Sequence, residues 1–153
     1  EGTVNYANLR TRYVDDTVST ASPAKLLTML YDRLVLDLQR AETAQRAGQR
    51  GAAGPHLTHA QDIVSELAST LDVSAWDGAK QLLSVYTFLL TELVNANVAG
   101  DPDRTAACRE LVEPLRDAWH EAAAQVAATT ATPLEPLAAA GAVRAYGGEL
   151  GVG

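Results

Sequence analysis

The stretch VSTASPAKLLTMLYDRL, residues 18–34, decides the fold. Ser22 and Pro23 place an N-cap hydroxyl before a proline whose missing N–H is harmless in the first turn of a helix. The apolar residues that follow are too dense for a helix that buries a single stripe: Leu26, Leu27, Met29, Leu30, Tyr31, Leu34, Val35, Leu36 and Leu38. Such a helix either occupies the centre of a bundle or leaves part of its surface for another chain.

Length and composition predict one soluble domain. The chain has 153 residues, of which 47% are apolar, which suits one domain with a modest core. Its formal net charge of −7 argues against nucleic acid and anionic membranes as partners. Cys108 is the single cysteine, so no internal disulfide forms and a reducing compartment is expected. We find neither a signal-peptide pattern nor an apolar run of the ~18 residues that span a bilayer, so we expect a cytoplasmic protein without membrane insertion.

Residues typical of helix starts occur at four places along the chain. The first helix is predicted from Pro23 to about Ala47, before Gly48. Gly54-Pro55 is predicted to start the second helix. A capping box of Ser74 and Asp77 is predicted to start the third, which ends near Val98. Asp101-Pro102 starts the fourth, in which Pro114 predicts a kink or a later true start.

The spacing of apolar residues predicts how these helices pack together. The second and fourth helices each show one apolar face; on the fourth this stripe is Ala107, Leu111, Val112, Leu115, Ala118, Trp119, Ala122 and Val126. The third is apolar on several sides, as the first is. Short connections favour an all-α, antiparallel up-down four-helix bundle over residues 22–128. Residues 1–21 are predicted to form an N-terminal arm and residues 129–153 a flexible tail. An apolar groove on the first and third helices would explain their excess of apolar residues.

The chain offers no pattern typical of catalysis. His56 and His59 stand three apart, but no Glu-x-x-His motif accompanies them, so we interpret them as solvated surface side chains rather than metal ligands. Cys108 lies on the apolar side of its helix without a nearby cation, which favours a core residue over a nucleophile. We therefore expect a protein that is not an enzyme, with no cofactor and no metal.

Four motifs, in order and at the expected spacing over residues 13–125, resemble the FliS family of flagellin-specific export chaperones. They are Tyr13 followed by VSTASPAKLLTMLYDRLVLDLQRA, then ELASTLDV, VYTFLLTELVNANVAGD and LRDAWHEA. The chain departs from the family pattern at Lys25, where an acid is common, and at Val85-Tyr86-Thr87-Phe88, where the family has Leu-Tyr-x-Tyr.

The resemblance implies a cytoplasmic chaperone that binds the disordered C-terminal segment of flagellin. It would prevent premature polymerisation and support delivery to the flagellar export gate. Monomer or weak homodimer is the expected state, and the N-terminal arm is expected to act as a displaceable lid. The alternative is a generic helical adaptor or self-dimerising bundle without specificity for flagellin.

Two sets of residues carry these expectations. Candidates for the flagellin-binding groove are Tyr13, Leu27, Leu30, Tyr31, Leu34, Tyr86, Leu89, Leu90 and Leu93, with Tyr86 half-exposed. Some of these must be core residues, and the sequence does not divide the two groups. Residues with a structural role are Thr20, Ser22 and Pro23 at the first helix start, Asn95 and Asn97 at the end of the third, and Asp117 with Trp119 as a pair near the bundle end.

Overall fold

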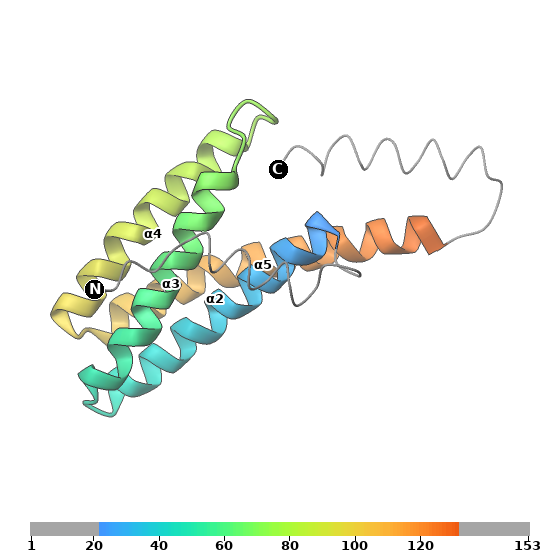
Figure 1. Cartoon of the computed structure of the whole chain (residues 1–153). Helices are drawn as coiled ribbons and strands as arrows, with labels where there is room; N and C mark the ends of the chain where they lie inside the picture. Colours follow the sequence, from blue (N-terminus) through green and yellow to red (C-terminus); the bar gives the residue numbers. More distant parts are fainter. Residues whose placement is uncertain (1–21, 132–153) are drawn as a thin grey trace.

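Four helices make up the described part of the chain, residues 22–131, in a computed structural model (Figure 1). They are α2 (Pro23–Arg46), α3 (Arg50–Thr70), α4 (Ala79–Ala99) and α5 (Pro102–Ala131). The prediction of an all-α four-helix bundle is confirmed for these residues. Most of the predicted arm and tail, residues 1–21 and 132–153, lies outside the described residues.

The first helix begins as the sequence predicts. Ser22 is the N-cap of α2, and its Oγ accepts a hydrogen bond from the Lys25 amide at 3.2 Å. Pro23 occupies the first turn, where no N–H is needed. Gly48, with φ of 72°, follows the last turn and donates its amide to the Gln45 carbonyl at 3.0 Å. A residue without a Cβ adopts this left-handed conformation at little cost, which explains the stop.

The predicted start of the second helix, at Gly54-Pro55, is wrong. α3 begins at Arg50, and Pro55 lies inside it. The Gln49 carbonyl accepts hydrogen bonds from both Ala52 and Ala53 at 3.1 Å, so the first turn closes before the proline. Pro55 lies in the second turn, where it forgoes one intrahelical hydrogen bond, and the helix continues through it with Ala53 and Leu57 buried in the core on either side.

The predicted capping box of the third helix is also wrong. α4 begins at Ala79, and the Ser74 hydroxyl donates to Asp72 Oδ1 at 2.6 Å in the preceding loop. The predicted end is confirmed, because Gly100 takes a φ of 64° directly after Ala99. A late start of the fourth helix is ruled out, since α5 runs unbroken from Pro102 through Pro114. It continues to Ala131, past the predicted boundary at residue 128.

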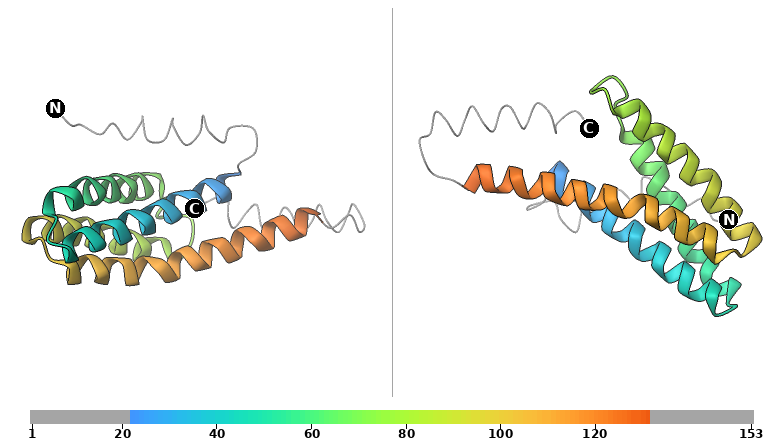
Figure 2. Two further views of the ribbon diagram at one scale, coloured as in Figure 1. Left: turned by 90° about the horizontal axis from the view of Figure 1, so that it is seen from below. Right: turned by 180° about the vertical axis from the view of Figure 1, so that it is seen from behind.

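The helices are arranged as two pairs. α2 packs closely on α3 and α5, and α4 packs on α3 and more lightly on α5. The C-terminal half of α5 extends beyond the α3–α4 pair (Figures 1 and 2). At the opposite end, Gln45 of α2 is hydrogen-bonded to both α4 and α5. Its Nε2 donates to the Ala96 carbonyl at 3.1 Å, and its Oε1 accepts from the Thr105 hydroxyl at 2.6 Å.

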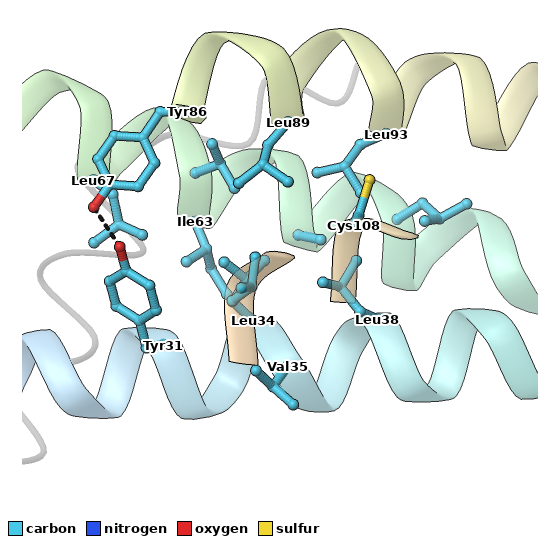
Figure 3. Close-up of a cluster of buried hydrophobic side chains, with 14 of the residues drawn as sticks. Tyr31, Leu34, Val35, Leu38, Ile63, Leu67, Tyr86, Leu89, Leu93 and Cys108 are labelled. Atoms are coloured by element: carbon cyan, nitrogen blue, oxygen red, sulfur yellow. Dashed lines mark hydrogen bonds between the residues drawn. The ribbon is translucent and has the colours of Figure 1, made fainter. Parts of the chain in front are cut away.

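One continuous core lies between the four helices (Figure 3). α2 and α3 contribute most of it, and α4 adds Leu82, Tyr86, Leu89 and Leu93 at the spacing of one helix face. α5 contributes Cys108 and Val112. The predicted stripe of α5 is partly wrong, because Ala107, Leu111 and Ala118 are exposed. Val112 of the stripe faces inward as predicted, together with Cys108 and the polar Thr105.

Candidate protein-binding surface

Five of the nine predicted groove residues are core residues, namely Tyr31, Leu34, Tyr86, Leu89 and Leu93. The expectation of a half-exposed Tyr86 is wrong, because its exposed fraction is 2%. Leu27, Leu30 and Leu90 are half-buried against the same core. Tyr13 lies outside the described residues. The surface open to a partner must therefore be found among other side chains.

An aromatic cluster of Tyr31, Tyr86 and Trp119 closes one end of the core. The hydroxyls of Tyr31 and Tyr86 are hydrogen-bonded at 2.6 Å and point toward one another between α2 and α4 (Figure 3). The Trp119 ring of α5 lies tilted on Tyr31, with the ring centroids 6.3 Å apart. Burial raises the pKa of both tyrosines, so both hydroxyls are neutral and one donates to the other. The cluster joins three helices where α4 and α5 separate.

Apolar side chains are exposed where α4 and α5 diverge. Near the Gly100 turn the two helices are bridged by Arg104 Nη1 and Glu92 Oε2, 3.3 Å apart. Phe88 lies one turn farther from Gly100 on α4, and Leu111 two turns farther along α5, so both lie on the facing sides. Phe88 is 55% exposed and Leu111 36% exposed.

Two half-buried residues, Val85 and Leu115, continue this strip of side chains toward Trp119. We call Val85, Phe88, Leu111 and Leu115 the α4–α5 apolar surface. Exposed large apolar side chains that adjoin one another are typical of sites that bind another protein. Sequence reasoning missed this surface because it assigned Leu111 to the core stripe. The density of apolar residues on the third helix was the available signal.

The outer face of α4 is apolar as well. Val94 and Val98 are exposed there, on the side turned away from the core. By length and composition alone α4 could cross a membrane, since its mean hydropathy reaches 1.3. Its inner face nevertheless supplies core residues of the bundle. The high hydropathy therefore reflects the buried core residues together with exposed valines, although Lys80 also lies exposed on this helix.

The residues predicted to have structural roles divide as follows. Ser22 and Pro23 start α2 as expected, and Thr20 lies outside the described residues. Backbone groups cap the end of α4, because the Gly100 and Asp101 amides donate to the Asn97 and Ala96 carbonyls. The Asn95 side chain is instead 3.5 Å from Glu92.

The predicted pair of Asp117 and Trp119 is wrong. Asp117 is exposed and accepts hydrogen bonds from Arg116, whereas Trp119 packs on Tyr31. Helix positions two residues apart point about 200° apart, so the two side chains face different neighbours.

A polar cluster that the sequence did not predict lies between α2 and α3. Asp37 is completely buried, accepts a hydrogen bond from His59, and lies 3.4 Å from Arg33 Nε. The Nδ1 of His56 is 3.9 Å from the same carboxylate. The interpretation as a solvated surface side chain is wrong for His59, whose ring is hydrogen-bonded to the buried Asp37 carboxylate, whereas His56 is one-third exposed. Among the described residues, no group of three such side chains is arranged to hold a metal ion.

The core role predicted for Cys108 is confirmed. The thiol is buried, and burial raises its pKa to about 11. A thiol with so high a pKa carries almost no thiolate at neutral pH and is a poor nucleophile.

Comparison with known proteins identifies the family of this chain. Residues 6–126 match the family model described as flagellar protein FliS. The chain is 32% identical to a protein of Bacillus subtilis over 119 residues, covering 75% of this chain and 86% of that protein. It is 30% identical to one of Vibrio cholerae over 109 residues (71% and 80%) and 29% identical to one of Escherichia coli over 123 residues (79% and 88%). All three are named flagellar secretion chaperone FliS.

These matches place the chain in a class of chaperones that assist secretion, not in a class of enzymes. The helical bundle of the described residues exposes apolar side chains on α4 and α5. The chain belongs to the FliS family of flagellar proteins.

Proposed function

We propose that this protein binds the C-terminal segment of flagellin in the cytoplasm, prevents its premature polymerisation and supports its delivery to the flagellar export gate. The observation that carries the proposal is the exposed α4–α5 apolar surface. A chain held for secretion exposes apolar side chains that would otherwise associate with other copies. A surface of matching chemistry that covers those side chains prevents this.

The geometry suits a segment that is unfolded before it binds. Phe88 and Leu111 are already exposed on helices that the Glu92–Arg104 ion pair holds together, so the chaperone itself reorders little. The client must instead order its backbone, which reduces the affinity for a given buried area. The net charge of −7 keeps the chaperone soluble while it exposes this surface.

Calorimetry with the cognate flagellin C-terminal peptide tests the function directly. We expect one-to-one binding without nucleotide or metal, and a negative heat-capacity change from apolar burial. If no heat and no co-elution appear up to micromolar concentrations, the proposed client is wrong.

Variants test the site separately from the function. Phe88→Ala should weaken peptide binding about 30-fold, since aromatic anchors often contribute about 2 kcal/mol. Its melting temperature should stay close to that of the unchanged protein because the ring is half in solvent. Val98→Ala is the matched control on the same helix, away from α5, and should leave the affinity unchanged. Equal losses in both variants would move the site to the outer face of α4.

Self-association is the competing use of the same surface. A stable homodimer that buries Phe88 and Leu111 and ignores the peptide would favour a self-dimerising bundle. Light scattering coupled to size exclusion distinguishes the two, and we expect a monomer or weak dimer.

A further inference from the structure

The junction of α2 and α3 carries a surface feature that shares no residue with the α4–α5 apolar surface. The last turns of α2, the loop at Gln49 and the first turns of α3 enclose a shallow hollow of about 390 Å³. Leu36 and Ala44 supply part of its apolar lining, and Arg40 and His56 supply its cationic and titratable groups. Carboxylates are absent from the lining, although the chain as a whole carries a net charge of −7.

Arg40 differs from the other arginines of residues 22–131 in its lack of an ion pair or hydrogen bond. The other arginines of residues 22–131 each hold an ion pair or a hydrogen bond; Arg109, for example, lies 2.9 Å from Glu42 and 2.7 Å from Glu113. Arg40 is exposed and has no such partner among the described residues. A guanidinium presents several donors in a plane that fits a carboxylate with two hydrogen bonds.

His56 adds a second group toward the same hollow. Its Nδ1 faces the Asp37 carboxylate at 3.9 Å, and its side chain is one-third exposed. Asp37 is completely buried and contacts His59 and Arg33, so its carboxylate is not exposed in the hollow. The hollow therefore combines an unpaired cation, an imidazole and an apolar floor.

We propose that this hollow binds an acidic side chain of a second protein, carried next to an apolar residue in an extended or loosely ordered segment. The carboxylate pairs with Arg40 and contacts His56, and the neighbouring apolar side chain packs on Leu36 and Ala44. The hollow lies on α2 and α3 and shares no residue with the α4–α5 apolar surface, so the acidic partner binds while a client is held.

Amide shifts of the isotope-labelled full chain test this proposal. The probe is acetyl-Leu-Glu-Asp-Leu-amide, and its neutral match is acetyl-Leu-Gln-Asn-Leu-amide. We expect saturable shifts at residues 39–49 and 56 with the acidic peptide, reduced at high salt because the contact is electrostatic. Arg40→Gln should weaken binding at least about fivefold. Lys80→Gln, an exposed cation on α4, is the control and should change nothing.

Several results would overturn the proposal. Equal binding of the neutral peptide, equal binding by Arg40→Gln, or an absence of saturable shifts at millimolar peptide would each do so. The same shifts with sodium acetate alone would reduce the hollow to a small-anion site. Arg40→Gln should also leave the affinity for the flagellin peptide unchanged, and a loss there would show that the two sites are one.

Discussion

The hydroxyl oxygens of Tyr31 and Tyr86 lie 2.6 Å apart and join α2 to α4 across the interior of the bundle. α2 packs mainly on α3 and α5, and α4 packs mainly on α3, so this hydrogen bond is a specific link between α2 and α4. Since both side chains are almost completely buried, neither hydroxyl can turn to water if its partner is removed.

Removal of one hydroxyl should therefore destabilise the protein. Tyr86→Phe is expected to lower the free energy of unfolding by about 1 kcal/mol or more, because the Tyr31 hydroxyl is left buried without this partner. The double variant Tyr31→Phe with Tyr86→Phe should lose less than the sum of the two single variants. Urea unfolding of the four proteins measures this coupling. Strictly additive losses would show that the bond contributes nothing of its own.

Truncation of the whole ring separates core from surface. Tyr86→Ala should lower the free energy of unfolding by about 3–5 kcal/mol, as expected for a buried aromatic residue. Phe88→Ala, two residues along the same helix, should lower it by less than about 1 kcal/mol because the ring is largely exposed. Equal losses would contradict the orientation of α4 described above.

Asp62 should reduce stability at neutral pH. Burial raises the pKa of its carboxyl, and the charge of His59 offsets only part of this effect. The folded protein therefore holds the proton more tightly than the unfolded chain, so this contribution to stability is present at low pH and lost as the pH rises. Asp62→Asn should raise the melting temperature at pH 7 by about 2 °C or more and bring no gain near pH 3.

The exposed Asp77→Asn is the control for this measurement and should change the melting temperature at neither pH. A stabilisation by Asp62→Asn that is the same at pH 3 and pH 7 would rule out the carboxyl charge as its cause.

Glu42 should show the opposite dependence on pH. Although partial burial opposes ionisation, hydrogen bonds from Arg109 and Arg46 lower the pKa of Glu42 below its ordinary value. Its contribution is present above the carboxyl pKa of the unfolded chain and is lost as the pH falls through the folded value. Glu42→Gln should therefore lower the free energy of unfolding by about 1 kcal/mol at pH 7 and by little near pH 3. Thermal unfolding at both pH values gives the comparison, and a larger loss in acid would contradict the ion pairs.

The sequence by itself determined the parts of this protein that depend on local chemistry. Ser22 and Pro23 start α2, and Gly48 and Gly100 follow the ends of α2 and α4, because capping and a positive φ depend on a few adjacent residues. The apolar density of the first and third helices correctly indicated a bundle, but of these two helices only the third exposes large apolar side chains among the described residues. The starts of α3 and α4 were harder, since Pro55 and Ser74 fit more than one local arrangement.

Only the tertiary structure decided which apolar residues face a partner. Tyr86 and Phe88 are two positions apart and both aromatic, yet one is in the core and the other in solvent. The rotation of each helix and the divergence of α4 from α5 set that difference, and both arise from packing against residues far away in the chain. The burial of Asp37 beneath His59 has the same origin, because their bond joins two helices and no local pattern encodes it.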